Sequence, residues 1–166
     1  ITRVSRIQSV KEKSGRAGAL VFVTVRHEIS NRDGLAIVDE HDIVFRDHAL
    51  PGEHALTPPA APSDQMWERV IRPNDVLLFR YSALTFNGHR IHYDRRYSTE
   101  VEGYPGLVVH GPLIATLLLD LLRCNVPSAR ISKFSFRAVS PLFDIGPFFV
   151  CGRTEGVEIR KKKKNS

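Results

Sequence analysis

Three polar side chains able to move protons or hold water fall within one short segment: Asn87, His89 and His92. The sequence around them is polar and irregular, which predicts a loop, and catalytic groups gather on loops carried by a rigid scaffold. An imidazole with a pKa near neutral can take and return a proton at neutral pH. A nearby amide can hold a water molecule for it. The segment therefore predicts chemistry in which water is added or removed.

A second motif, His110-Gly111, directly precedes Pro112 and a strongly apolar run that ends at Leu122. Proline suits the first position of a helix, so the motif predicts a helix start with unpaired backbone N–H groups at Gly111. Such groups can bind a thioester carbonyl oxygen and stabilise the enolate that forms when water adds. We expect His110 itself to be a hydrogen-bonded residue that orients the loop.

The two motifs in this order resemble the MaoC-like, or (R)-specific enoyl-CoA hydratase, family. Its signature is roughly Asp-x-Asn-Pro-[Ile/Leu]-His, followed downstream by His-Gly. The equivalent positions here are Asn87 for Asp, His89 for Asn, Arg90 for Pro and His92 for the catalytic His, with His110-Gly111 downstream. The segment 82–92 is more similar to one branch, which includes mesaconyl-CoA and itaconyl-CoA hydratases and the mitochondrial 3-hydroxyacyl-thioester dehydratase.

This resemblance implies a hydro-lyase that interconverts a 2-enoyl-CoA and a 3-hydroxyacyl-CoA. His92 would be the base or acid, Asn87 would orient water and the Gly111 amide would bind the carbonyl oxygen. Because Asn87 stands in place of Asp and cannot accept a proton, His92 would have to do more alone. The expected substrate-binding residues are His89, His110, Tyr81 and Arg90. The CoA thioester is the substrate, and we expect no other cofactor and no metal.

The elements that position these residues follow from local patterns in the second half of the chain. A strand is expected over 68–71, then a helix from Pro73-Asn74-Asp75 to near Leu84, capped by Asn74 or Asp75. One or two helical turns are expected over 94–100. Apolar residues surround almost the whole helix after Gly111, so it should be buried. Alternation over 131–138 predicts a half-buried strand, and another strand is expected over 148–151.

The first half reads as an antiparallel meander with strands over 4–10, 20–29 and 35–45, the last two joined by a turn at 31–34. The resemblance implies an α+β hot-dog fold, as a double hot dog with an incomplete first unit and a truncated second unit. The expected division is a partial first unit over 1–46, a proline-rich linker over 47–66, a catalytic unit over 67–156 and a basic tail over 157–166. The sequence starts without Met in strand-like sequence, so we expect the natural N-terminus to be missing.

The formal net charge of +6 favours anionic partners, including a phosphate-bearing ligand such as CoA. The basic run 160–164 is expected to be a solvated tail, so no nucleic-acid partner is predicted. No apolar run is long enough to span a membrane. The two cysteines, Cys124 and Cys151, lack metal-site spacing, which indicates a reducing setting: cytoplasmic, or mitochondrial in a eukaryote. Hot-dog units usually pair, so a homodimer or an equivalent pairing is expected.

Three alternatives stay open: a hot-dog acyl-CoA thioesterase, a non-catalytic acyl-CoA-binding subunit, and nucleic-acid binding through the basic run. A thioesterase usually needs a carboxylate near the helix start, and 106–114 offers none. Asp120 is expected at the edge of its helix or paired with a basic group. Some side chains have no clear partner and are expected at the surface: His27, His41, His48 and His54. Some arginines could meet CoA phosphates or be solvated: Arg80, Arg90, Arg95 and Arg96.

Overall fold

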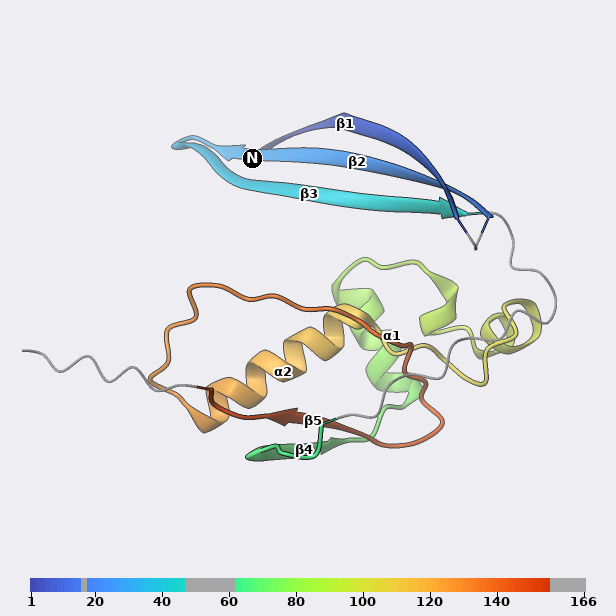
Figure 1. Ribbon diagram of the computed structural model, residues 1–166, viewed down its shortest axis with the longest axis vertical. Helices are drawn as coiled ribbons and strands as arrows, with labels where there is room; N and C mark the ends of the chain where they lie inside the picture. The colour runs from blue at the N-terminus through green and yellow to red at the C-terminus, as the bar shows by residue number, and fades with distance from the viewer. Residues whose placement is uncertain (16–17, 47–61, 156–166) are drawn as a thin grey trace, which may run out of the picture. The chain divides into compact units, whose positions relative to one another are not determined.

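The computed structural model describes residues 1–15, 18–46 and 62–155. The chain divides into two compact units, Ile1–Leu56 and Thr57–Ser166, and each has its own antiparallel sheet (Figure 1). Most of the predicted linker and all of the predicted basic tail lie outside the described residues.

The first unit is a three-stranded sheet of β1 (Thr2–Gly15), β2 (Gly18–Asn31) and β3 (Gly34–Arg46) in the order β1-β2-β3. Gly34 has a φ of 114°, which only glycine adopts at little cost, so it allows the tight turn between β2 and β3. The predicted meander is confirmed. The strands extend beyond the predicted runs because the hydrogen-bond ladder continues through their polar ends.

His27 is not at the surface, so that expectation is wrong. It lies on the central strand β2 and is 8% exposed. Its Nδ1 lies 2.7 Å from the Ser5 hydroxyl oxygen, and Arg3 also contacts the ring. The cause is its position: a residue on a central strand is covered by neighbours from the strands on both sides. His41 is exposed as expected, and His48 and His54 lie outside the described residues.

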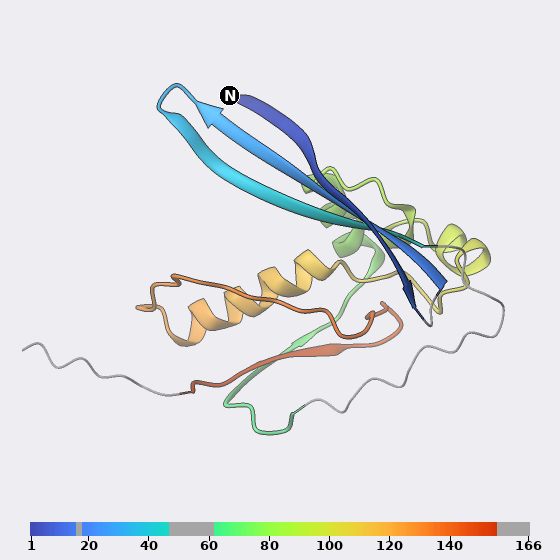
Figure 2. The same ribbon diagram turned by 45° about the horizontal axis from the view of Figure 1, so that its top comes forward.

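The second unit sets one long helix against a two-stranded sheet. β4 (Trp67–Ile71) pairs antiparallel with β5 (Phe148–Gly152), and α2 (Gly111–Asn125) packs against both (Figures 1 and 2). The α+β class is confirmed, and a helix laid on an antiparallel sheet is the arrangement expected of a hot-dog unit. The buried core of this unit consists of apolar side chains: Leu78, Leu107, Val109, Leu113, Leu121, Phe148 and Val150.

α1 (Asp75–Leu84) begins and ends where the sequence predicts. Asn74 is its N-cap, and the Asn74 Oδ1 accepts a hydrogen bond from the Leu77 N–H at 2.9 Å. A short 3₁₀ turn (Arg90–His92) and a π-helical turn (Tyr97–Val101) follow, the second in the region predicted to hold one or two turns.

α2 is less buried than its sequence predicts. Within the described residues only Leu113 and Leu121 of this helix are buried, while Thr116, Asp120 and Arg123 are exposed. The apolar residues surround the helix, but the two short strands that it contacts cover only one side of it. Asp120 lies at the helix edge and pairs with Arg69 at 2.7 Å, as expected.

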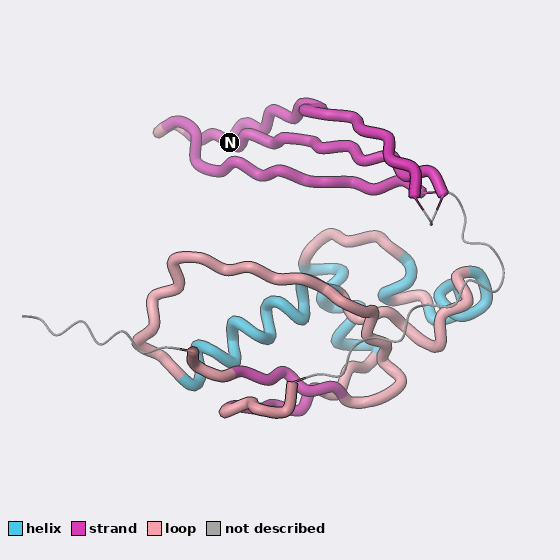
Figure 3. Tube along the Cα trace, in the orientation of Figure 1, coloured by secondary structure: helices cyan, strands magenta, loops and turns pink. Residues whose placement is uncertain are grey.

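The strand predicted over 131–138 does not form, and Figure 3 draws this segment as loop. Its alternating aromatic side chains, Phe134 and Phe136, are exposed. Alternation describes how one strand would share its two faces, but a strand also needs a neighbour for its backbone hydrogen bonds. The segment finds no such neighbour among the described residues. No helix in the described part of the chain is long and apolar enough to cross a membrane.

Candidate active site

The loop that carries Asn87 leaves α1 through a tight C-terminal turn. The Asn87 N–H donates to the Ser82 carbonyl at 2.9 Å, and the Phe86 N–H donates to the Ala83 carbonyl. This pattern is a Schellman cap, which normally places glycine at the left-handed position. Phe86 occupies it with a φ of 53°, a conformation that costs a non-glycine residue about 1–2 kcal/mol. The turn fixes the direction in which the chain presents Asn87.

The two polar atoms of the Asn87 side chain differ in their hydrogen bonding. Its Oδ1 accepts a hydrogen bond from the His89 N–H at 3.0 Å, which closes a local turn. The Nδ2 group has no partner within the described residues. Asn87 can therefore donate a hydrogen bond to a water or a carbonyl oxygen, but it cannot act as a base.

The His92 ring is held in one neutral tautomer. Its Nδ1 lies 2.7 Å from the Val108 carbonyl oxygen, which can only accept, so Nδ1 carries the proton and Nε2 carries the lone pair. Burial lowers the pKa of His92 below its ordinary value of 6.5, against the opposing effect of the Val108 hydrogen bond. At neutral pH the ring is therefore uncharged. Nε2 has no hydrogen-bond partner in the described chain and is not sealed from solvent.

His110 lies flat against His92, with ring centroids 3.8 Å apart and planes 19° from parallel. It is 1% exposed, and its Nε2 lies 2.8 Å from the Ser82 hydroxyl oxygen. Burial, with a smaller effect from His92, lowers the pKa of His110 to about 4. Both rings of the stack are thus neutral at physiological pH. His110 Nδ1 is buried without a partner among the described residues.

His110 is also the residue before the first turn of α2. Gly111 begins the helix, and its N–H has no partner in the part of the chain that the structure describes. A Cβ added at Gly111 would meet no atom within 4 Å beyond its chain neighbours and its own helix backbone, so the space on the side-chain side of Gly111 is open. His92 therefore stacks on His110, the residue that adjoins Gly111 at the start of α2.

The segment that carries His110 is anchored by Asp144, a residue that the sequence does not single out. Asp144 Oδ1 accepts from the Leu107 N–H at 2.8 Å, and the Asp144 N–H donates to the Leu107 carbonyl at 3.0 Å. Its carboxylate is 2% exposed and pairs with Arg95. No local pattern around Asp144 marks it, because its partners are distant in the sequence.

The predicted substrate-binding residues lie at different distances from this stack. The Tyr81 ring contacts His110 with centroids 4.9 Å apart, and the His89 ring lies edge-on to His92 at 5.6 Å. Arg90 is already engaged: it pairs with Asp94 at 2.7 Å and lies over the Tyr97 ring. The hydrogen bonds that Arg90 donates to the Asp94 carboxylate raise the pKa of Arg90.

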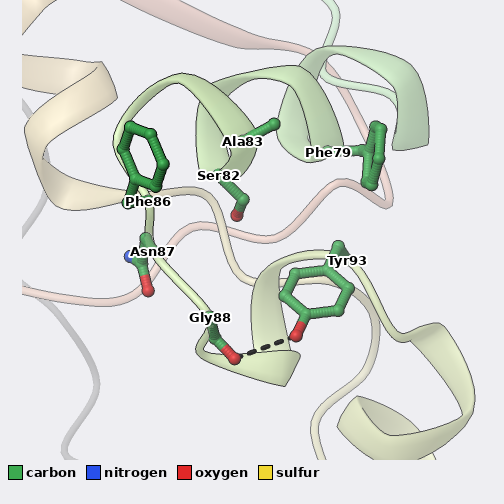
Figure 4. A pocket seen from close by; sticks show the side chains of 7 residues that line it. All are labelled: Phe79, Ser82, Ala83, Phe86, Asn87, Gly88 and Tyr93. Atoms are coloured by element: carbon green, nitrogen blue, oxygen red, sulfur yellow. Dashed lines mark hydrogen bonds between the residues drawn. The ribbon is translucent and has the colours of Figure 1, made fainter.

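Two hollows flank α1. One, of about 270 Å³, lies beside Asn87 and is shown in Figure 4; its lining is mostly aromatic or small: Phe79, Ser82, Ala83, Phe86, Asn87, Gly88 and Tyr93. The other, of about 680 Å³, is lined by Arg80, Tyr81 and neighbouring residues of α1. Arg90, Arg95 and Arg96 all have carboxylate partners, whereas Arg80 has none among residues 1–15, 18–46 and 62–155.

Comparison with known proteins decides the family. The model of the hydroxyacyl-thioester dehydratase type 2 family matches residues 1–144. The chain belongs to this family. It is 48% identical over 153 residues to a mesaconyl-C(4)-CoA hydratase of Chloroflexus aurantiacus, covering 92% of this chain and 54% of the relative. It is 43% identical over 84 residues to the mitochondrial hydroxyacyl-thioester dehydratase type 2 of Schizosaccharomyces pombe, covering 49% of this chain and 28% of the relative.

The resemblance inferred from the two motifs is thus confirmed at the level of the family. The chain spans about half the length of the first of these relatives, and less of the second. Among solved structures, the peroxisomal multifunctional enzyme type 2 of Drosophila melanogaster aligns with a TM-score of 0.49 and 16% identity, over 76% of this chain and 23% of that one.

Proposed function

We propose that this chain carries an active site for the reversible hydration of a 2-enoyl thioester of CoA to the 3-hydroxyacyl thioester. The observation that carries the proposal is a neutral imidazole, His92, stacked on the residue that adjoins the open N-terminus of α2. A base with a free lone pair and a polarising N–H at one place are what addition of water to an enoyl thioester requires. The family supports the same chemistry.

In the hydration direction, the Asn87 amide donates to the oxygen of a water molecule and holds it near His92. Nε2 of His92 takes a proton from this water as its oxygen bonds to C3 of the enoyl group. The C2–C3 π electrons move toward C2 and the carbonyl, and the Gly111 N–H stabilises the resulting enolate oxygen. The His92 imidazolium then returns its proton to C2, so one water is added in total. Dehydration follows the same steps in reverse.

The groove beside Arg80 supports a substrate with a phosphate-bearing carrier. Arg80 is a cation without an ion-pair partner in the described residues, and it lines the same groove as Tyr81, whose ring contacts His110. Guanidinium groups bind phosphate well through paired hydrogen bonds. We assign the CoA phosphates to this groove and the acyl group to the space near Asn87. The other expected binding residues, His89 and Arg90, follow Asn87 in the loop after α1.

The test is to incubate the full chain separately with crotonyl-, mesaconyl- and itaconyl-CoA and to identify the products. The expected result is formation of a 3-hydroxyacyl-CoA from at least one substrate, with no release of free CoA thiol. Thiol release would instead support the thioesterase alternative. Tight binding of an enoyl-CoA without any product would support a non-catalytic acyl-CoA-binding subunit.

We further propose that the second unit functions paired with another hot-dog unit, in a homodimer or an equivalent assembly. Several large apolar side chains of this unit are exposed: Phe79, Phe86, Phe149 and Ile145. The expected setting is the cytoplasm, or the mitochondrion in a eukaryote, where the thiols of Cys124 and Cys151 stay reduced. Both cysteines are free in the structure. Sedimentation of the purified chain measures its assembly state.

A further inference from the structure

Ser82 takes no part in the steps above, yet it is hydrogen-bonded both to His110 and to Asn87. It is 4% exposed on α1, and its hydroxyl oxygen lies 2.8 Å from Nε2 of His110. Its backbone carbonyl accepts the hydrogen bond from the Asn87 N–H. Its side chain also lines the hollow beside Asn87, projecting from α1 toward the loop of Gly88 and Tyr93 (Figure 4).

We propose that Ser82 and His110 form a positioning pair that holds the His92 ring in the orientation its role as base requires. The inference rests on the proposed function of His92. Neither residue of the pair contacts the reacting atoms: Ser82 fixes His110, and the flat face of His110 fixes His92. Ser82 begins the segment 82–92 that resembles one branch of the family, but the sequence gives it no role, and its partner is 28 residues away along the chain.

A nucleophilic role for Ser82 does not fit the same contacts. Activation of a serine needs a basic imidazole whose second nitrogen is oriented by a third group. His110 is held neutral by burial, with its pKa lowered to about 4, so it is a weak base. Its other nitrogen, Nδ1, has no carboxylate or other partner among the described residues. The hydroxyl therefore serves to fix the ring of His110.

The need for such a pair follows from how His92 is held. The only hydrogen bond of its ring in the described chain, from Nδ1 to the Val108 carbonyl, places one edge of the ring but leaves the opposite edge free to tilt about that contact. The stack with His110 at 3.8 Å and 19° removes that freedom. The His110 ring in turn has one hydrogen bond in the described chain, the one to Ser82. Loss of the Ser82 hydroxyl leaves both nitrogens of a buried ring unpaired, which favours a reoriented or more hydrated His110.

The effect on His92 should be visible in its titration as well as in its rate. The titratable side chains around the ring are His110 on one face, His89 at its edge and Tyr81 beyond His110. Burial by this packing is the main cause of the lowered pKa of His92. A His110 that no longer packs flat admits water, so the acid limb of the pH–rate profile should move to higher pH.

The test compares Ser82→Ala with Ser82→Thr in the full chain, using the enoyl-CoA that the wild type hydrates. We expect Ser82→Ala to lower kcat on the order of 10- to 100-fold, as a small misplacement of a catalytic group does, with KM within about twofold. The acid limb should move toward pH 6.5, and Ser82→Thr, which keeps a hydroxyl, should recover most of the rate. Thr116→Ala removes an exposed hydroxyl from α2 and should match the wild type.

A second variant and a spectroscopic readout keep the test decisive. Ser82→Cys keeps the side-chain volume but bonds weakly, so it should lose less rate than Ser82→Ala and serves if the alanine variant is unstable. Nitrogen NMR of the histidine rings should show one tautomer of His92 in the wild type and a mixture in Ser82→Ala. If the Ser82→Ala and Ser82→Cys variants both kept the wild-type kcat and pH profile, the proposed positioning role of Ser82 and His110 would be contradicted. An active His92→Ala would show instead that the proposed function has failed.

Discussion

The two units of the chain each bury a histidine against a serine, but only one of these pairs lies beside the candidate active site. In the first unit His27 Nδ1 lies 2.7 Å from the Ser5 hydroxyl, within the face of a three-stranded sheet. In the second unit His110 Nε2 lies 2.8 Å from the Ser82 hydroxyl. The local hydrogen bond is nearly the same, so it cannot by itself define function.

The difference lies in what surrounds each pair. His110 stacks on a second imidazole and adjoins the start of α2, where the Gly111 N–H is unpaired among the described residues. His27 has Ser5 and Asp39 opposite it on the neighbouring strands, and it contacts Arg3. The central strand of a sheet offers no free backbone N–H, because its N–H groups are hydrogen-bonded to the strands on either side. The comparison indicates that a buried histidine can take part in chemistry beside the end of a helix, where backbone N–H groups are unpaired.

Apart from loss of His92 itself, the largest expected effect comes from removing the N–H at the start of α2. Gly111→Pro deletes this donor, and we expect kcat to fall about 10²- to 10³-fold, the usual loss for one oxyanion donor. Steady-state hydration kinetics measure the loss, and circular dichroism shows whether the helix is kept. A Gly111→Pro variant that folds and retains wild-type kcat would show that this N–H does not bind the carbonyl oxygen.

The next effect is on stability. The buried, neutral His110 ring should make the free energy of unfolding depend on pH. Because the pKa of His110 is about 4 in the folded chain against 6.5 ordinarily, protonation favours unfolding. Stability should be full above pH 6.5 and should fall as the pH drops toward 4, by up to about 3 kcal/mol from this group. His110→Gln removes this dependence. Denaturant unfolding at several pH values measures it, and equal slopes in both proteins would contradict the buried neutral ring.

A smaller effect is expected at the left-handed residue between Ser82 and Asn87. Phe86→Gly relieves the strain of a φ of 53°, and since the Phe86 side chain is 96% exposed, little packing is lost. We expect the free energy of unfolding to stay constant or rise by up to about 1 kcal/mol. Thermal unfolding measures this. A clear loss of stability would mean that the aromatic ring is covered in the folded protein.

The smallest effect is the one expected in the first unit. His27→Asn replaces the buried imidazole by a smaller polar group and should leave kcat within about twofold, because the hydrogen-bond partners of the His27 ring, Ser5 and Arg3, belong to the first unit. Its cost should appear in thermal stability instead. A large loss of kcat at unchanged stability would place His27 in the site and remove the contrast between the two units.

The sequence predicts those parts of the site that depend on neighbours along the chain. The start of α1 at Asn74, the start of α2 at Gly111 and the loop carrying Asn87 all follow from capping and turn chemistry. The confirmed family follows from the same two motifs. These features need only local hydrogen bonds, which the residue types specify.

Contacts between distant segments could not be predicted in this way. The Ser82–His110 bond, the Asp144 anchor of Leu107 and the burial of His27 all join residues far apart in sequence. The strand expected over 131–138 failed for the same reason: its alternation is a local property, while its pairing is not. The number of sides on which α2 is covered is likewise set by its neighbours in space.

The most direct test of the account measures hydration of the preferred enoyl-CoA by His92→Gln and by His41→Gln, which changes an exposed histidine of β3. Glutamine keeps a polar side chain but cannot take a proton from water. We predict that His92→Gln lowers kcat by about 10²- to 10⁴-fold, the range for a general base, while His41→Gln stays within about twofold of the wild type. A folded His92→Gln protein with the same kcat as His41→Gln would contradict the central role of His92.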